Sequence, residues 1–334
     1  MGYILGVDGG NTKTDYYLFD TDGNFVDMYR DGSCSHERLH DSFDGTYRVM
    51  KKVFDEFLGK HNLKPEDLVA SAFGLAGCDL PYQEKCLCEK IEQLGFKNYK
   101  LVNDSALGIK VGTKRGYGVC SINGTGTSVY GIGKDGKTLQ VGGIGSITGD
   151  EAGGRFVSRR AVRKVFDEIM RFGKKTSLTP IVMDLIGHPK DEDLMEKIAL
   201  LYLEGKIDYN IITVACFEEA NKGDEVALEI LTEMADNLAR SAASAVVRLE
   251  LGENPEVVLA GSVYVKGSCP VLVQETKRRI SMYAQKECDV HVMSIPPATG
   301  AIVWAYELAT GEYPSYTKRM EIVAAVEKKL KEKQ

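Results

Sequence analysis

Two stretches of this sequence pass through the same succession of segments: an apolar run, a glycine turn, a second run, an Asp-Gly turn and a third run. The first stretch occupies residues 3–29 and the second occupies residues 117–141. Asp-Gly pairs flanked by such runs are typical of β-hairpins, and internal repeats indicate an architecture built from related units. The sequence therefore predicts two related three-stranded meanders, one at the start of each half of the chain.

Glycine is concentrated in the second of these stretches. The chain has 35 glycines among 334 residues, and 13 of them lie between residues 116 and 154. Glycine serves where the backbone must adopt a positive φ or approach another group closely. We therefore expect several tight turns in this stretch, and we expect some of them to lie against a ligand.

Beyond the two meanders, predicted strands alternate with predicted helices, which favours mixed α/β sheets covered by helices. The expected strands are 3–7, 15–19, 25–29, 69–75, 99–103, 117–122, 128–132, 138–141, 257–260 and 289–294. Helices are expected at 42–59, at 81–94, near Ala106, over much of 155–251 with Asp224 as an N-cap, and from about Thr299. The Lys- and Glu-rich tail from Lys318 is predicted to be a solvated surface helix.

Composition and charge exclude several classes of function. The formal net charge is −6, so the chain has no basic field for nucleic acid or anionic lipid. No apolar run approaches the ~18 residues of a membrane span, and residues 1–10 lack the pattern of a signal peptide. Cys86 and Cys88 are too close together for a zinc knuckle. We therefore expect a cytoplasmic protein with reduced thiols.

The segment from Gly131 to Thr138 matches the P-loop pattern, and its glycines also match the dinucleotide-binding pattern. Both patterns require a helix directly after the glycine loop, because the helix N-terminus holds the phosphate. The residues after Thr138 read Leu-Gln-Val-Gly-Gly, which is not the first turn of a helix. We therefore predict a hairpin turn at Asp135-Gly136.

A glycine and threonine turn occurs at the same place in each meander, at Asp8–Thr14 and at Gly124–Thr127. Backbone amides in such turns bind anions, and two facing turns could hold one polyphosphate between two domains. Asp8 is placed to hold Mg²⁺ through water, the mode that this ion prefers, while Thr12, Lys13 and Thr14 add donors. An ordinary hairpin in each half is the alternative, and the equivalent placement of the two turns favours the phosphate site.

Asp104 directly follows a predicted buried strand, at the end where ligand crevices commonly lie. A carboxylate there could take the proton of a substrate hydroxyl during phosphoryl transfer. It could also act as the N-cap of the following helix, and the two roles are compatible. In a second acidic motif, Asp150 and Glu151 could complement a helix dipole, whereas the glycines around them indicate close approach to a ligand.

These residues together resemble the superfamily of sugar kinases, actin and heat-shock ATPases. Within it the chain is similar to the BadF/BadG/BcrA/BcrD ATPase family, which includes N-acetylglucosamine kinases. The resemblance covers nearly the whole chain. It rests on the two turns, Asp104, the Gly149–Glu151 motif, the turn at Leu259–Ser262 and the helix start at Gly300-Ala301.

The resemblance implies two ribonuclease-H-like lobes with mixed five-stranded sheets and a Mg-ATP cleft between them. The first lobe would contain residues 1–114 together with about 297–334. The second would contain residues 115–296 with a helical insertion. The resemblance leaves the oligomeric state open, with a homodimer as one option.

The resemblance also implies roles for individual residues. Asp104 would be the general base that acts on the 6-hydroxyl of the sugar. The phosphates and adenosine would contact Gly9, Gly10, Asn11, Thr12, Lys13, Thr14, Gly124, Thr125, Gly261 and Ser262. The sugar would contact Ser35, His36, Gly77, Asp104, Thr125, Gly126, Gly143, Ile144, Gly145 and Asp150. Unless it binds sugar, His36 would be a surface or capping residue.

The chain departs from the family pattern at three places near the expected sugar site. Gly142-Gly143-Ile144-Gly145 stands where acetylglucosamine kinases have Gly-Gly-Trp-Gly. Ser35 or His36 stands in for an asparagine, and Cys78 stands where glycine is frequent. These departures concern the identity of the sugar and leave the phosphoryl chemistry unaffected.

The leading hypothesis is an ATP-dependent kinase for the 6-hydroxyl of N-acetylglucosamine or a related amino sugar, with Mg²⁺ as cofactor. The alternative is an ATPase that activates a 2-hydroxyacyl-CoA dehydratase or benzoyl-CoA reductase through a shared iron–sulfur cluster, and the cysteine spacing does not match that arrangement. A non-catalytic sugar sensor is a third option, for which we expect no DNA-binding segment and find no clustered zinc cysteines in the sequence.

Overall fold

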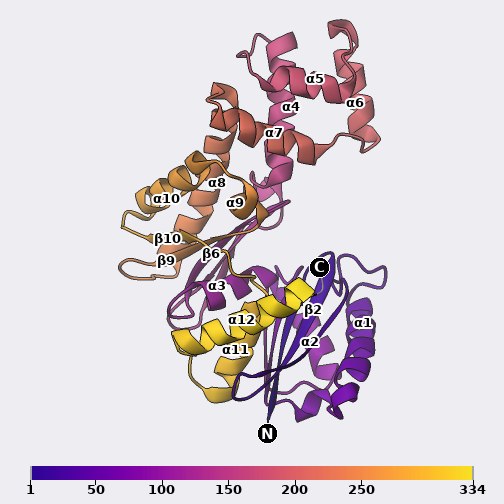
Figure 1. Cartoon of the computed structure of the whole chain (residues 1–334), viewed down its shortest axis with the longest axis vertical. Helices are drawn as coiled ribbons and strands as arrows, with labels where there is room; N and C mark the ends of the chain where they lie inside the picture. Colours follow the sequence, from indigo (N-terminus) through magenta and orange to yellow (C-terminus); the bar gives the residue numbers. More distant parts are fainter. Residues whose placement is uncertain (1, 333–334) are drawn as a thin grey trace.

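The computed structural model describes residues 2–332, and it contains two five-stranded mixed sheets that lie one beyond the other (Figure 1). The strand order is β3-β2-β1-β4-β5 in the first sheet and β10-β9-β6-β7-β8 in the second. Counted in chain order within each sheet, the first three strands form an antiparallel meander. The fourth strand pairs in parallel with the first. The two halves therefore share one topology, which confirms the predicted duplication and the two-sheet α/β fold.

The strands of the first sheet are β1 (Tyr3–Gly9), β2 (Lys13–Asp20), β3 (Phe25–Gly32), β4 (Ala70–Leu75) and β5 (Tyr99–Val102). Those of the second are β6 (Gly118–Asn123), β7 (Thr127–Ile132), β8 (Thr138–Val141), β9 (Glu256–Ala260) and β10 (Asp289–Val292). Each lies within a few residues of its expected position.

The α-helices are α1 (Ser42–Phe57), α2 (Pro81–Gln93), α3 (Leu107–Gly112), α4 (Gly154–Met170), α5 (Leu178–Ile186), α6 (Leu194–Leu203), α7 (Tyr209–Asn221), α8 (Glu225–Arg248), α9 (Ser262–Lys266), α10 (Pro270–Ala284), α11 (Thr299–Thr310) and α12 (Tyr316–Glu332). Short 3-10 turns are η1 (Gly59–His61), η2 (Pro65–Asp67), η3 (Asp104–Ala106), η4 (Ser146–Thr148) and η5 (Asp191–Asp193).

Both faces of the first sheet are covered, as alternating side chains of β1 show. Leu5 and Val7 join the core beneath α1 and α2, whereas Ile4 joins the core that contains α11 and α12. A strand buried on both faces has a continuous apolar sequence, which explains the Tyr3–Val7 run. Figure 1 shows the same arrangement, with the C-terminal helices lying on one side of the first sheet and α1 and α2 on the other.

The second core lies between the second sheet and the long helix α8, with α10 beside it. Helices α4 to α7 extend beyond this sheet, on the side away from the first sheet (Figure 1). The opposite face of the second sheet shares one continuous core with α3 and the C-terminal helices. Because that core includes side chains from both sheets, α3 and the residues around it join the two sheets.

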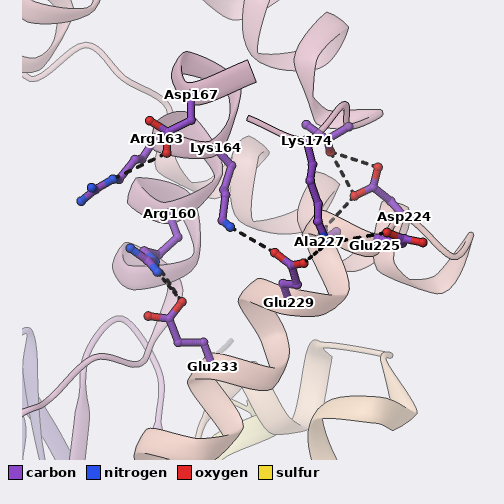
Figure 2. A network of polar contacts seen from close by, with 11 residues as sticks. Arg160, Arg163, Lys164, Asp167, Lys174, Asp224, Glu225, Ala227, Glu229 and Glu233 are labelled. Carbon is purple, nitrogen blue, oxygen red and sulfur yellow. Dashed lines mark hydrogen bonds and ion pairs between the residues drawn. The ribbon is translucent and has the colours of Figure 1, made fainter. Parts of the chain in front are cut away.

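Ion pairs join the helical insertion to α8 (Figure 2). Arg160 of α4 contacts Glu233 at 2.5 Å, and Glu229 accepts from both Lys164 at 3.1 Å and Lys174 at 2.6 Å. These side chains are partly exposed, and such pairs contribute little stability one by one. Together they join α4 and the segment before α5 to α8.

Asp224 is the N-cap of α8, as predicted. Its Oδ1 accepts from the amide of Ala227 at 2.8 Å, and its Oδ2 accepts from the amide of Ser177 at 2.7 Å. One carboxylate thus satisfies a free amide of the helix start and also fixes the segment before α5.

The C-terminal tail differs from its prediction on one face. Ile322, Val323 and Val326 of α12 are buried and belong to the core shared with α11, whereas Glu321 and Lys328 are exposed. The prediction of a solvated surface helix was therefore wrong for the apolar stripe. The apolar stripe of Met320, Val323, Val326 and Leu330 can be read in the sequence, but the many charges of the tail favoured a solvated helix, whereas this stripe packs into the core that covers the first sheet.

Within residues 2–332, no helix has both the length and the apolar character that crossing a membrane would require.

Candidate functional site

The first glycine turn joins β1 to β2 and is closed by a hydrogen bond from the amide of Gly10 to the carbonyl of Lys13, at 2.9 Å. Gly9 is tightly enclosed, because a Cβ atom there would lie 2.6 Å from Leu75 and 2.9 Å from Cys34. Asn11 and Thr12 are exposed at the tip. The turn therefore has a rigid base and an accessible tip, which suits it to receive an anion.

Thr14 lies differently from the other predicted phosphate contacts. It is fully buried, and its hydroxyl accepts from the amide of Cys34 at 3.1 Å. The side chain thus fixes the segment that leads to Ser35. Its contact with phosphate stays a prediction, as does that of the exposed Lys13, whose ammonium lies 3.3 Å from Asp15.

Asp8 lies near the end of β1, and its carboxylate makes no hydrogen bond or ion pair within the described part of the chain. Burial, followed by the charges of Asp104 and Asp15, raises its pKa to about 7. Asp15 itself is paired with Arg30 at 2.5 Å. The charges of Lys13 and Arg30 lower the pKa of Asp8 but offset the rise only in part. A carboxylate in these surroundings fits a divalent cation.

No cluster of three or more potential metal ligands occurs between residues 2 and 332. Magnesium does not need one, since it commonly binds one or two carboxylates and keeps several waters. Asp8 would hold the ion in that way.

Asp104 is separated from β5 by Asn103 alone and begins η3, which contacts β4 of the first sheet and β6 and β7 of the second. Burial raises its pKa to about 6, with further contributions from the charges of Asp79 and Glu37. The N-cap of η3 is Asn103, whose side chain accepts from the amide of Ser105 at 2.9 Å. The capping role considered for Asp104 therefore belongs to Asn103, and Asp104 remains available for chemistry.

Ser35 and His36 are adjacent buried residues, and the ring of His36 lies against Gly77. They are 2% and 8% exposed, and the Ser35 hydroxyl and the His36 Nδ1 have no hydrogen-bond partner in the described structure. A Cβ atom on Gly77, whose φ is +82°, would lie 2.7 Å from the ring of His36. Unpaired polar atoms at such depth are rare, which fits a site that receives a polar ligand.

Contacts with α2 indicate the tautomer of His36. Gln83 accepts through Oε1 from the amides of Asp79 at 3.1 Å and Leu80 at 2.8 Å, so its amino group faces the His36 Nε2 at 3.4 Å. Nε2 therefore accepts, and the proton lies on Nδ1. Burial also lowers the pKa of His36, which favours this neutral form.

The second glycine turn joins β6 to β7 and contacts two other glycine segments. The amide of Gly153 donates to the Asn123 side chain at 2.9 Å, and the amide of Gly154 donates to the carbonyl of Gly124, also at 2.9 Å. At Gly261, φ is +103° and a Cβ atom would lie 2.4 Å from the carbonyl oxygen of Asn123. Glycine at this position is therefore required by both conformation and space.

A cavity of about 1040 Å³ opens beside this meeting point. Gly124, Thr125 and Ser262, all predicted nucleotide contacts, line it. Its other walls come from α7 and α9 and from the segment before α7, and include Thr213 and Lys266. Sequence reasoning missed these residues, because no pattern marks which helices of the insertion face the cavity.

Asp150 organises the glycine loop after β8. Its Oδ2 accepts from the amides of Gly143 at 2.9 Å and Gly145 at 2.7 Å, and from the hydroxyl of Thr148 at 2.9 Å. Gly126 and Ile144 are exposed. The contacts of Gly126, Gly143, Ile144, Gly145 and Asp150 with sugar remain predictions.

The segment that imitates a P-loop is a hairpin turn between β7 and β8. Gly133 donates to the carbonyl of Lys137 at 2.7 Å, and Gly136 has a φ of +81°. The residues after Thr138 form a strand. The hairpin prediction is confirmed.

Polar residues that the sequence analysis did not single out meet at Asp79, whose charge acts on Asp104. They are Asp79 itself, Gln83, Asn103 and Gln140. For Gln83 a signal was present, since its side chain accepts from the amide three residues earlier, at the spacing of a capping box. Asp79 and Gln140 carry no such signal, because they meet only after the two sheets have assembled.

Known proteins with similar sequences span nearly the same length. An N-acetylmuramic acid/N-acetylglucosamine kinase from Clostridium acetobutylicum is 28% identical over 309 residues, which cover 91% of this chain and 98% of the relative. An N-acetyl-D-glucosamine kinase from Dictyostelium discoideum is 26% identical, covering 79% of this chain and 86% of the relative.

Among solved structures, a glucokinase of the ROK family from Streptomyces griseus, determined with glucose and AMPPNP, aligns with a TM-score of 0.55 at 17% identity. The alignment covers 93% of this chain and all of that one. At this identity the likeness concerns the fold alone. The model of the BadF/BadG/BcrA/BcrD ATPase family matches residues 5–305, and the chain therefore belongs to that family.

Proposed function

We propose that this protein is an ATP-dependent kinase that phosphorylates the 6-hydroxyl of N-acetylglucosamine or a related amino sugar. The observation that carries the proposal is the position of Asp104. A carboxylate whose pKa is raised to about 6 begins the turn that contacts both sheets, and its charge acts on Asp8 beside the first glycine turn. The names of the two relatives support the amino sugar as the acceptor.

Asp104 would accept the proton of the sugar hydroxyl as the phosphoryl group is transferred. A pKa of about 6 suits this role, since the carboxylate is ionised at neutral pH while it retains some basicity. Mg²⁺ held by Asp8 through water would neutralise charge on the phosphates. Amides of the two glycine turns would orient the phosphates, so catalysis would consist mainly of positioning.

The sugar would lie against the wall formed by Ser35, His36 and Gly77. The Nδ1 proton of His36 would donate to a sugar oxygen, and the Ser35 hydroxyl supplies a second polar contact. The glycine loop held by Asp150 would close the other side. The sugar site would therefore draw on both lobes.

The nucleotide would occupy the side formed by Gly124, Gly261 and Ser262, where the large cavity opens. We also propose lobes of residues 1–114 with about 297–334, and of residues 115–296. This division is supported by α11 and α12, which pack on the first sheet.

Sugar-dependent release of ADP from Mg-ATP tests the proposal. The panel would include N-acetylglucosamine, glucosamine, N-acetylmuramic acid, N-acetylmannosamine and glucose. We expect Asp104→Asn to lower turnover by about 10²–10⁴-fold while leaving ATP binding nearly intact. Asp55→Asn, which removes an exposed carboxylate on α1, is the matched control. Unchanged phosphorylation in Asp104→Asn would contradict the assignment.

The competing function is an ATPase that activates a partner enzyme through an iron–sulfur cluster. Cys86 and Cys88 both lie on α2, and the described residues offer no cysteine cluster that could hold a metal. Anaerobic purification distinguishes the two functions, because a cluster would colour the protein. Colour together with ATP hydrolysis that no sugar stimulates would favour the activator, and sugar binding without ADP release would favour a sensor.

A further inference from the structure

One carboxylate oxygen connects the two lobes next to Asp104. Asp79 lies between β4 and α2 of the first lobe. Its Oδ1 accepts from the Asn103 amide group at 2.9 Å and from the Gln140 amide group at 2.6 Å. Asn103 follows β5 in the first sheet, whereas Gln140 lies on β8 in the second.

The orientation of both amides follows from their other partners. Asn103 accepts through Oδ1 from the amide of Ser105, which can only donate, so its amino group must face Asp79. The amino group of Gln140 also donates to the carbonyl of Gly142 at 3.1 Å. Both side chains are therefore donors to one charged acceptor, which makes these hydrogen bonds stronger than neutral ones.

Each donor belongs to a segment of the proposed active site. Asn103 directly precedes Asp104 and caps η3, the turn that begins with Asp104. Gln140 lies on β8 two residues before Gly142, the first residue of the glycine loop, and a Cβ atom on Gly143 would lie 2.4 Å from its Nε2. Asp79 thus contacts the neighbour of the proposed base on one side and the support of the proposed sugar loop on the other.

A hydrogen bond from the backbone amide of Asp79 to α2 fixes the position of this residue. Its amide donates to Oε1 of Gln83, and the amino group of Gln83 faces His36. Pro81 begins α2 two residues later, which restricts the chain further. A site held by a framework of this kind keeps its geometry more precisely than one built on a free loop.

We propose that Asp79 is a positioning residue that sets the orientation of Asp104 relative to the glycine loop of the opposite lobe. The inference rests on the proposed kinase function. Without the Asp79 carboxylate, the segment that carries Asp104 and the loop at 142–145 would lose their shared anchor. A misplacement of about 1 Å at a reacting group can cost about 10²-fold in rate.

The first test compares Asp79→Ala with Asp79→Asn in the full-length protein, with the best sugar of the panel and Mg-ATP. Alanine removes the acceptor, and we expect kcat to fall by about 10- to 100-fold while the KM for Mg-ATP stays within about twofold. Asparagine keeps an oxygen that can accept both hydrogen bonds. We therefore expect it to restore most of kcat, a rescue that a loss of folding alone would not show.

The second test is a double-mutant cycle with Gln140→Ala. If Asp79 and Gln140 act through their contact, the double variant should be about as slow as the slower single variant. Multiplicative effects of the two changes would instead mean that they act independently. That result would overturn the coupling between lobes. The single variant Gln140→Ala removes the contact between the lobes while leaving Asp79 and α2 unchanged. If Asp79→Ala folds poorly, the kcat of Gln140→Ala alone still tests whether this contact matters.

The outcomes separate the inference from the function on which it rests. If the wild-type protein phosphorylates no sugar of the panel, the proposed function fails and the positioning role falls with it. If the wild-type protein is active and Asp79→Ala keeps its kcat, the inference alone is overturned.

Discussion

At the scale of single residues, the site contains carboxylates whose charges act on one another. Burial raises the pKa of Asp8 to about 7 and that of Asp104 to about 6, and each of these acids is affected by another carboxylate. Residues with strongly perturbed pKa values are frequent at functional sites. The sequence identified both acids as candidates, but it contained no information on their burial.

The rate of sugar phosphorylation should depend on the ionisation of Asp104. Its active form as a base is the carboxylate, so we expect kcat/KM to fall as the pH drops through about 6. Asp79, Glu37 and Asp8 are the charged groups whose fields act on it. A pH–rate profile from about pH 4.5 to 8.5 measures this acid limb. A flat profile down to pH 5 would exclude Asp104 as the base.

Asp104 should also destabilise the unliganded protein near neutral pH. An aspartate in the unfolded chain has its ordinary pKa of 3.8, whereas the pKa of Asp104 in the fold is about 6, so between these values the folded state binds more protons than the unfolded state. The free energy of unfolding therefore decreases as the pH rises through this window. We expect Asp104→Asn to raise Tm by a few degrees at pH 8 and to show little difference near pH 4. Thermal unfolding beside Asp55→Asn measures the effect, and equal Tm values at both pH values would contradict it.

At the scale of elements, a short sequence pattern predicted the correct structure only when the segment that follows it was considered as well. Gly131–Thr138 contains every residue of a P-loop, yet β8 rather than a helix follows it. Asn103, not Asp104, caps η3, although both residues can cap. Local patterns predicted that a turn occurs at each place, while the neighbouring elements determined what the turn does.

Lys137→Ala should leave nucleotide turnover unchanged. Lys137 closes the hairpin between β7 and β8 through its backbone, and its side chain is exposed. Steady-state kinetics with Mg-ATP would measure this, with Asp104→Asn as the inactive reference. A large loss of turnover in Lys137→Ala would restore the P-loop interpretation.

Gly300→Ala should destabilise the contact between α11 and α3. A Cβ atom at Gly300 would lie 2.0 Å from the backbone oxygen of Leu107, a distance at which one helix must move. Overpacking of this kind typically costs about 1–3 kcal/mol, which a urea denaturation curve can resolve. Gly59→Ala is the control, since its Cβ would meet nothing within 4 Å. Equal denaturation midpoints for the two variants would show that the helices are less closely packed than described.

At the scale of the whole molecule, two sheets of one topology are joined through a core that contains α3 and the C-terminal helices. The proposed base, the proposed sugar wall and the first glycine turn belong to the proposed first lobe. The second glycine turn, the Asp150 loop and the large cavity come from the second. Such a site is complete only when the lobes are held together.

Binding of both substrates should therefore bring the lobes closer. We expect the radius of gyration from small-angle scattering to decrease when the sugar and a non-hydrolysable ATP analogue are added together, and to change less with either alone. Closure that excludes water is common in enzymes of this chemistry. No decrease with both ligands at saturation would mean that the two lobes do not move on binding.

The sequence by itself determined the local structure and the repeated order of the elements, because turn chemistry and apolar periodicity act between residues that are near in the chain. The sequence also predicted that Asp104 and both glycine turns lie at the ends of strands, because the strands next to them can be recognised from local apolar runs. Only the tertiary structure decided that Asp79 meets Gln140 of the second sheet and that α7 and α9 line a cavity. These contacts join distant segments, and they depend on packing that no local pattern records.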